Sequence, residues 1–491
     1  MTRLQAVVPV LIGGAMALGQ APWGLVFPMF AALALFAAQG AGQSSPRRAA
    51  WYAFRVGFGY FSVALHWIVY PFLVEPDLFA WMAPFAAVLL PAGLSLFWAG
   101  GAWLGQRLGG GRAGWALGLI IAELARAHLF TGFPWVQFAD AYLDTVTAPQ
   151  IANFGAQGLT VLLIALAAVA SVGAGRGWRG WILPVAISGV LAVPLGPDVA
   201  PASADAPIVR LVQPNAPQED KWNPLKVEEF YQRMLAASAA DGSPDLIVWP
   251  ETAVPWLLSA GDPLLAEVAE VAGGVPVALG INRGQDGLYY NSLALVRAGG
   301  EVFGTYDKRH LVPFGEYVPF GEALASLGIH GLAASDGAAF AAGQPSAALE
   351  VPNIGRIWPL ICYEGIFPGL SDGAQDARMI LLVTNDAWFG PKAGPLQHLA
   401  QARLRAIETG VPVVRVANTG VSAVMDGQGA VVASLGLGAQ GFIDVALPDR
   451  GARPLYSVLG PWPLSIGVIA ILCMILLRRR YKPIDPEGQS L

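Results

Sequence analysis

The chain has 491 residues, of which 55% are hydrophobic and only 13% are charged. The charged fraction is about half that of ordinary soluble domains. Such a composition excludes a disordered chain and a protein that coats nucleic acid, because both need more charge. The mean hydropathy of +0.52 instead indicates a membrane protein. A net charge of −5 over this length implies no particular partner.

Apolar stretches dominate the first 200 residues and recur once near the C-terminus. Each is close to the ~20 residues that cross a hydrocarbon core, although the first two are short. A run that follows Arg3 could be a secretion signal, but further spans come after it, so we expect a retained helix. The eight predicted spans cover residues 5–20, 24–38, 51–74, 79–104, 113–130, 155–173, 180–197 and 461–478.

Basic residues between the predicted spans fix the expected orientation. Arginines occur in every second loop, and a basic cluster follows the last span. The opposite connections, 75–77 and 140–144, are acidic or neutral. Because short basic loops stay in the cytoplasm, we expect the N-terminus inside and residue 200 outside.

Between about 203 and 455 the sequence has the pattern of a soluble α/β domain. Short β-branched runs alternate with helical patterns, one of which covers 395–409 and stops at Gly410. Near-continuous apolar strands indicate a sheet that is buried on both faces. The predicted strands are Ile208–Val212, Leu246–Trp249, Val275–Ile281, Ser292–Val296, Ile357–Ile361, Met379–Thr384, Val413–Ala417 and Ala430–Ser434.

These patterns predict four parts of the chain. A seven-helix membrane domain covers 1–200, and an α/β domain on the outer face covers 203–455. An eighth membrane helix follows at 461–478, and the cytoplasmic tail is 479–491.

Cys362 is the first candidate for chemistry. It ends the apolar run 357–361 and precedes Gly365, a strand-to-turn junction of the kind that presents nucleophiles. Cys473 lies in the last predicted span and cannot reach it, so we expect no disulfide. A lone thiol in an oxidising compartment favours a reactive residue over a small buried one. The histidines lack metal-ligand spacing, so no metal site is expected.

Such a thiol needs a base or a cation, because a pKa of about 8.5 leaves only a few per cent ionised near neutral pH. Glu251 ends one apolar run, and Lys308 precedes a loop rich in glycine and proline. Either residue alone also fits a solvated surface. We expect both residues and Cys362 to follow strands of one sheet, whose ends meet at a single crevice.

Three segments resemble the triad segments of the nitrilase superfamily, and the spans around them resemble one branch, the apolipoprotein N-acyltransferases. The triad segments are Trp249–Glu251, Tyr306–Lys308 with Pro313–Glu316, and Ile361–Glu364. Further matching segments are Thr131–Trp135 with Gln137, Gln213–Asn215 with Trp222, and Thr384–Gly390 followed by Gln397 and His398.

The resemblance implies an αββα sandwich beside a bundle of about eight membrane helices, in the bacterial inner membrane with the catalytic domain on the periplasmic side. It implies transfer of an acyl chain from a phospholipid, mainly phosphatidylethanolamine, to the α-amino group of a diacylglyceryl-cysteine apolipoprotein. A cysteine thioester would divide this reaction into two ping-pong steps. No cofactor and no nucleic acid would take part.

The resemblance also implies a role for each matched residue. Glu251 would be the general base, Lys308 the oxyanion stabiliser and Cys362 the nucleophile. Glu316 would orient the lysine. For substrate binding, the matched residues are Trp222, Tyr363, Glu364, Trp135 and Phe133.

Simpler interpretations remain open for several of these features. Trp135, Phe133 and Trp222 fit the lipid entrance or interfacial anchoring equally well. The apolar loop 315–340 fits a lipid contact or an ordinary covering loop. For Glu123 and Arg126, spaced i, i+3, we favour a structural ion pair.

Two alternative functions also remain. A membrane-tethered amidase would use the same triad with water as the acceptor. A transporter would use Glu123, Arg126 and His66 as a pathway and the outer domain as a receptor, although the spans show no obvious internal repeat.

Overall fold

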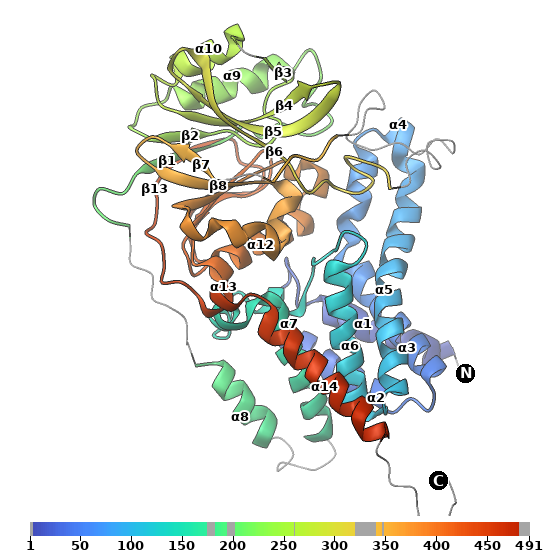
Figure 1. Cartoon of the computed structure of the whole chain (residues 1–491). Helices are drawn as coiled ribbons and strands as arrows, with labels where there is room; N and C mark the ends of the chain where they lie inside the picture. The colour runs from blue at the N-terminus through green and yellow to red at the C-terminus, as the bar shows by residue number, and fades with distance from the viewer. Residues whose placement is uncertain are drawn as a thin grey trace, which may run out of the picture. The chain divides into compact units, whose positions relative to one another are not determined.

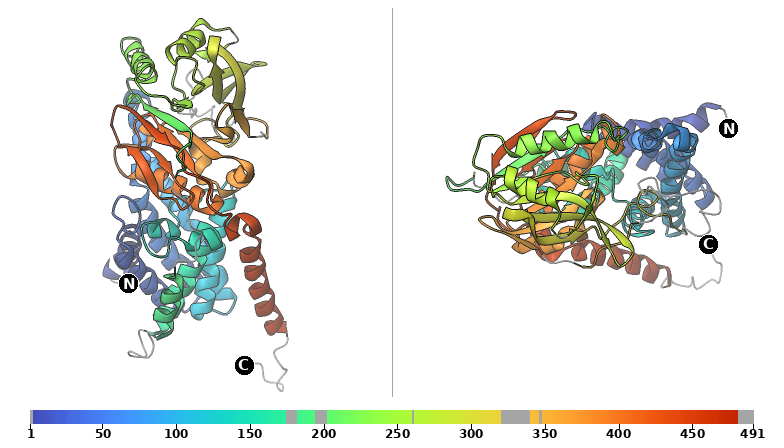
Figure 2. Two further views of the ribbon diagram at one scale, coloured as in Figure 1. Left: turned by 90° about the vertical axis from the view of Figure 1, so that its left-hand side faces the viewer. Right: turned by 90° about the horizontal axis from the view of Figure 1, so that it is seen from above.

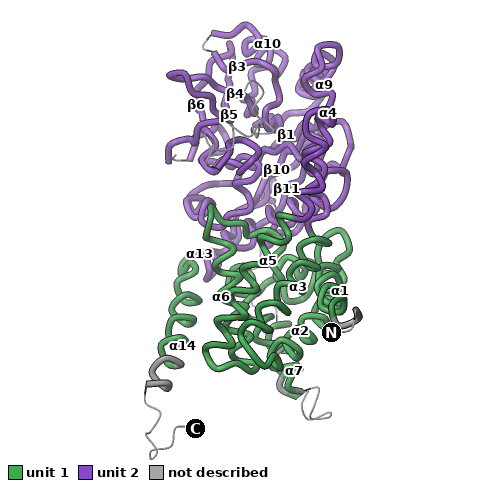
Figure 3. Tube along the Cα trace, turned by 90° about the vertical axis from the view of Figure 1, so that its right-hand side faces the viewer, with its two compact units in different colours: residues 1–64, 89–194, 458–491 green, residues 65–88, 195–457 purple. Residues whose placement is uncertain are grey.

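The computed structural model describes residues 3–173, 182–193, 202–259, 261–319, 340–345 and 348–480. Most of the apolar loop predicted over 315–340, both ends of the span predicted over 180–197 and the tail beyond 480 lie outside these residues. The chain divides into two compact units (Figure 3). Unit 1 comprises 1–64, 89–194 and 458–491, and unit 2 comprises 65–88 and 195–457.

Unit 1 is helical. Several of its helices are strongly apolar, which is typical of helices that lie in lipid. Helices α1 and α3 approach closely, because Gly13 faces the Val56 carbonyl and Gly59 faces the Val10 carbonyl, where a Cβ atom would clash. The helices are α1 (Arg3–Ala17), α2 (Val26–Ala41), α3 (Pro46–Ala64), most of α5 (Ala83–Arg107), α6 (Gly111–His128), α7 (Gln150–Gly173), α8 (Ile182–Leu191) and α14 (Trp462–Arg480) (Figure 1).

Fewer helices qualify as membrane spans than the sequence predicts. Among the described residues, Pro76–Arg107 and Gln150–Val172 are long and apolar enough to cross a membrane, and one bent pair would make a third. Shorter apolar helices occur at Ala6–Ala17, Val26–Ala41 and Trp462–Met474. The structure thus supports two or three spans by length and composition, rather than eight.

The span predicted over 51–74 is not one straight helix. Helix α3 ends at Ala64, and the chain bends by 51° into the 3-10 helix η1 (His66–Leu73). Pro71 lies inside η1 and disfavours an α-helix there, because it lacks an N–H and its ring clashes with the carbonyl four residues earlier. This segment belongs to unit 2, where the Trp67 Nε1 donates to Gln397 Oε1 at 2.9 Å.

Unit 2 contains two sheets (Figures 1 and 2). The first has the order β13-β1-β2-β4-β5-β6, and β3 (Leu257–Leu258) also pairs with β4. Its other strands are β1 (Ile208–Gln213), β2 (Leu246–Val248), β4 (Val277–Gln285), β5 (Leu288–Arg297), β6 (Glu301–Asp307) and β13 (Gly441–Ala446). The second has the order β12-β11-β10-β9-β8-β7, with β7 (Leu349–Val351), β8 (Gly355–Ile361), β9 (Met379–Thr384), β10 (Val413–Ala417), β11 (Ser422–Met425) and β12 (Val431–Leu435).

The two sheets pack face to face, and helices cover their outer faces. One core lies between the sheets and includes Leu246 and Val248 from the first sheet and Leu381 from the second. Ile247, which alternates with its neighbours, instead packs beneath α9 (Val227–Ser238) and α10 (Pro263–Val271). A third core joins the second sheet to α12 (Ala393–Thr409) and the 3-10 helix η8 (Pro368–Asp376). The result is the expected αββα sandwich.

Candidate active site

The three predicted catalytic residues lie together at one edge of the sandwich. Glu251 follows β2 and Lys308 follows β6, both in the first sheet, whereas Cys362 follows β8 in the second. The prediction that all three follow strands of one sheet is therefore wrong. Apolar strands of two stacked sheets have the same sequence pattern, so the sequence could not separate them.

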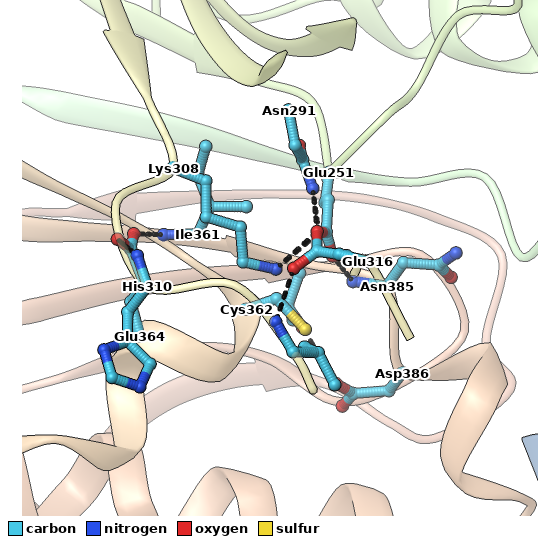
Figure 4. A network of polar contacts seen from close by, with 12 residues as sticks. Glu251, Asn291, Lys308, His310, Glu316, Ile361, Cys362, Glu364, Asn385 and Asp386 are labelled. Atoms are coloured by element: carbon cyan, nitrogen blue, oxygen red, sulfur yellow. Dashed lines mark hydrogen bonds and ion pairs between the residues drawn. The ribbon is translucent and has the colours of Figure 1, made fainter. Parts of the chain in front are cut away.

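Lys308 is held between two carboxylates (Figure 4). Its Nζ lies 2.9 Å from Glu316 Oε1 and 3.5 Å from Glu251 Oε1, and its side chain is 1% exposed. Burial alone lowers the pKa of Lys308, but the charges of Glu316, Glu251 and Cys362 outweigh it and raise the pKa above its usual value. The lysine is therefore a fixed cation at this site.

Both oxygens of Glu251 accept hydrogen bonds. Oε1 accepts from Asn291 Nδ2 at 2.7 Å, and Oε2 accepts from the Asn385 backbone N–H at 2.8 Å. The same Asn291 nitrogen lies 3.0 Å from Glu316 Oε1 and so bridges the two carboxylates. The sequence analysis missed Asn291. The sequence offered one sign of it: a polar amide side chain just before the apolar run 293–296 of a strand.

Cys362 begins the 3-10 turn η7 (Cys362–Ile366) with a φ of +52°, a strained value for a residue with a Cβ atom. The side chain is buried. Burial and the charge of Glu251 raise the pKa of its thiol, and Lys308 and a hydrogen bond with Thr384 lower it less. The resting thiol is therefore protonated, and it needs a base to become a nucleophile.

A buried chain of polar groups holds the backbone of Cys362 from behind. His398 Nε2 donates to the Cys362 carbonyl oxygen at 3.1 Å, and His398 Nδ1 lies 2.9 Å from Asp386 Oδ1. Arg415 donates to Asp386 Oδ2 at 2.5 Å. Burial would raise the pKa of Asp386, but Arg415 and His398 hold it well below its usual range. The Asp386 carboxylate is therefore ionised, and it fixes the histidine ring.

Glu364 connects the lysine loop to the cysteine turn. The carboxylate accepts hydrogen bonds from the Tyr306 hydroxyl at 2.7 Å and from the backbone N–H groups of Arg309 and Ile361, each at 2.8 Å. Glu364 is fully buried, and it acts within the protein framework behind the thiol. Tyr363 is also buried, with its ring 5.1 Å from that of Phe367.

The other predicted substrate-binding residues lie in two places. Trp222 is 41% exposed in unit 2, on the loop after β1. Phe133 and Trp135 lie in unit 1 and stack on each other, and Trp135 is buried. Arg126 donates to the carbonyl oxygen of Trp135 at 2.8 Å.

The predicted structural pair in unit 1 is confirmed. The Arg126 guanidinium lies 2.6 Å from Glu123 Oε2, and both side chains are buried. Glu123 also accepts a hydrogen bond from Trp98 Nε1 at 2.6 Å.

Comparison with known proteins covers nearly the whole chain. The carbon-nitrogen hydrolase family matches 208–454, and the apolipoprotein N-acyltransferase N-terminal domain matches 12–170. The apolipoprotein N-acyltransferase of Rhodopseudomonas palustris is 37% identical, covering 97% of this chain and 95% of the relative. That of Bradyrhizobium diazoefficiens is 36% identical, with coverage of 97% and 95%.

Among solved structures, a CN-hydrolase superfamily protein from Xanthomonas campestris is 21% identical and covers 58% of this chain and 98% of its own, with a TM-score of 0.38. The relatives that match along almost the full length decide the family. On that similarity, the chain belongs to the apolipoprotein N-acyltransferase family.

Proposed function

We propose that this enzyme N-acylates lipoproteins by moving an acyl chain from a phospholipid, mainly phosphatidylethanolamine, onto Cys362 and then onto the α-amino group of a diacylglyceryl-cysteine. Membership of the family supports the overall reaction. One observation carries the mechanism: the buried thiol of Cys362 lies beside Lys308, whose Nζ is 3.5 Å from Glu251 Oε1. These are the groups that nucleophilic acyl transfer requires.

In the first half-reaction Glu251 takes the proton from Cys362 as the sulfur attacks the ester carbonyl of the phospholipid. The C–S bond forms, the bond to the glycerol oxygen breaks, and Glu251 returns the proton to that oxygen as the lysophospholipid leaves. Lys308 and the backbone N–H after Cys362 stabilise the negative charge on the carbonyl oxygen. One such donor contributes roughly 3–4 kcal/mol in comparable sites.

In the second half-reaction the neutral amine of the acceptor attacks the thioester. Glu251 accepts a proton from the amine as the C–N bond forms, and it passes that proton to the sulfur as the C–S bond breaks, which restores the thiol and the carboxylate. The hydrogen bonds from Asn291 and Asn385 keep the Glu251 carboxylate in one position for both proton transfers. One base thus serves both half-reactions, and the kinetics would be ping-pong because the lysophospholipid leaves the thioester before the acceptor reacts.

The proposed topology follows the charge pattern of the loops. Seven spans within 1–200 and one at 461–478 would place the domain 203–455 on the periplasmic face of the bacterial inner membrane. Both substrates would reach the site from the membrane, and Trp222, Phe133 and Trp135 stay proposed substrate-binding residues. This arrangement is tested by introducing single cysteines into alternate loops of the protein and labelling them in intact spheroplasts with a reagent that does not cross the membrane. Labelling of a basic loop in intact spheroplasts would contradict it.

Trapping of the acyl-enzyme tests the mechanism. After incubation of the full chain with phosphatidylethanolamine, mass spectrometry should find a hydroxylamine-labile acyl group on Cys362, and a diacylglyceryl peptide should remove it. Cys362→Ser should abolish the adduct while the protein still folds, and Cys473→Ser is the matched control. Lys308→Ala should fold and form no adduct. Normal turnover by Cys362→Ser would disprove the nucleophile assignment.

The same experiment separates the alternative functions. The match to carbon-nitrogen hydrolases makes water the alternative acceptor. An amidase would be loaded by a soluble amide and would release its acyl group to water as fast as to the peptide. A transporter would form no adduct with either donor.

A further inference from the structure

A second lysine lies beside the proposed catalytic residues, and the mechanism above does not use it. Lys221 is on the loop after β1, and its side chain is only 4% exposed. Its Nζ donates to the backbone carbonyl oxygen of Glu251 at 3.2 Å and lies 4.9 Å from the centre of the Trp222 ring. The ammonium is thus placed between an exposed indole and the peptide group of the general base.

Lys221 differs from Lys308 in its partners. Lys308 has two carboxylates within 3.5 Å. For Lys221, by contrast, the described part of the chain provides no carboxylate within ion-pair distance. The carbonyl of Glu251 occupies one of its three N–H donors. A buried ammonium without a counter-ion is unfavourable, and an anion that entered the site would relieve this cost.

The charge state of Lys221 fits such a role. Burial lowers its pKa to about 8, although the charges of Glu251 and Cys362 raise it. The side chain is therefore still largely protonated at neutral pH.

The chemistry of the substrates indicates which anion this is. The acceptor presents an amine, which a cation would repel when the amine is protonated. The donor phospholipid has a phosphodiester on the same glycerol as the ester that is cleaved. Lysine is a common point-charge ligand for phosphate oxygens. We propose that Lys221 binds the phosphodiester of the acyl donor, an assignment that rests on the proposed function and adds a donor-recognition residue to the same site.

This contact would give the enzyme its preference for phospholipids over neutral esters. The phosphodiester would anchor the glycerol backbone near Glu251 while the acyl ester reaches Cys362. When the lysophospholipid leaves, the anchor leaves with it, and the site is open to the acceptor.

Donor selectivity of the full-length protein in detergent micelles tests the proposal. Acylation of Cys362 is followed in single turnovers with phosphatidylethanolamine and with a p-nitrophenyl ester of the same fatty acid. In Lys221→Met the ratio of kcat/KM for the phospholipid to that for the ester should fall about 10- to 100-fold, the loss expected for one charge-assisted hydrogen bond. Lys221→Arg should restore most of the ratio.

The matched control is Lys226→Met. Lys226 is on the same loop, but its Nζ pairs with Asp220 at 2.6 Å and its side chain is 46% exposed. The control should leave the ratio at the wild-type value. An unchanged ratio in Lys221→Met, or equal losses with both donors, would overturn the proposal, because the lysine would then act on the oxyanion or on the fold.

A second measurement uses the wild-type protein and so does not depend on the folding of a variant. Glycerol 3-phosphate should inhibit the reaction with the neutral ester, and glycerol at the same concentration should not. Inhibition should weaken as the pH rises through about 8, because the ammonium is lost. Equal effects of the two compounds would also overturn the proposal. A wild-type protein that no phospholipid acylates would instead refute the proposed function itself.

Discussion

Lys308 lies closer to Glu316 than to Glu251: its Nζ is 2.9 Å from Oε1 of the first and 3.5 Å from Oε1 of the second. Asn291 joins the two carboxylates through one amide nitrogen. We infer that the two glutamates have different roles in the proposed mechanism. Glu316 would hold the lysine in place, and Glu251, with the looser contact, would exchange protons with the substrates.

Replacement of Glu316 by Gln should therefore slow acylation while the protein still folds. The variant keeps the shape of the side chain but removes a negative charge that raises the pKa of Lys308. We expect a loss of about 10- to 100-fold in the acylation rate, with little change in KM. The basic limb of the pH–rate profile should move to lower pH, because Lys308 would lose its proton earlier.

Single-turnover acylation between pH 6 and 10 measures both effects. Glu350→Gln is the matched control, since Glu350 is 70% exposed and lies 3.5 Å from Arg356 away from the site. A wild-type profile for the Glu316 variant would show that this residue does not position the lysine.

Alkylation of Cys362 should respond in opposite ways to its two charged neighbours. The charge of Glu251 raises the thiol pKa, and that of Lys308 lowers it. In Glu251→Gln the pH of half-maximal alkylation by iodoacetamide should therefore fall, even though acyl transfer is lost. In Lys308→Met it should rise. Mass spectrometry in a Cys473→Ser background measures alkylation of Cys362 alone. If the half-maximal pH shifts in the same direction in both variants, the opposite effects assigned to Glu251 and Lys308 are contradicted.

Gly280 in β4 should be intolerant of any side chain. A Cβ atom there would lie 2.6 Å from the Cα atom of Glu251 and would also meet the Pro250 carbonyl. Gly280→Ala should displace the catalytic carboxylate and reduce acylation about 100-fold, as misplacement by an ångström can do. In the same strand, Gly284→Ala meets nothing closer than Leu257 at 3.8 Å, so its rate should be near that of the wild type. Equal rates for the two variants would contradict this close approach.

His398 should act as a positioning residue for the nucleophile. His398→Leu removes the donor to the Cys362 carbonyl and leaves Asp386 with one partner fewer, so we expect a stability loss of about 1–3 kcal/mol. The kcat should fall by about tenfold with KM nearly unchanged, because the strained turn at Cys362 relaxes. His398→Gln, which can still donate an N–H, should recover part of kcat. Urea unfolding and steady-state kinetics separate the two effects, and an unchanged kcat would rule out positioning.

The central strands of the sandwich were predictable because they are buried on both faces. Strands Met379–Thr384 and Val413–Ala417 occur with the predicted bounds. The end of α12 was equally clear, since Gly410 takes a φ of +69° that favours glycine. In such segments the local pattern and the tertiary environment agree.

Edge strands and tertiary partners could not be predicted in the same way. Strand β6, which precedes Lys308, lies at the edge of its sheet and is only half-buried, so it lacks an apolar run. Asn291 and Lys221 belong to no motif, and their importance comes from groups that are distant in sequence. The bend between α3 and η1 was missed because both segments are apolar, and a hydropathy average over the whole stretch does not register a change of direction.

The burial of Cys362 has a consequence beyond the need for a base. Thiolates rather than thiols attack peroxides and disulfides, and Cys362 is only 5% exposed with a thiol pKa raised by its surroundings. Conversion to sulfenic acid should therefore be slow between turnovers. The environment that would make the proposed nucleophile dependent on Glu251 would also protect it from oxidation while no substrate is bound.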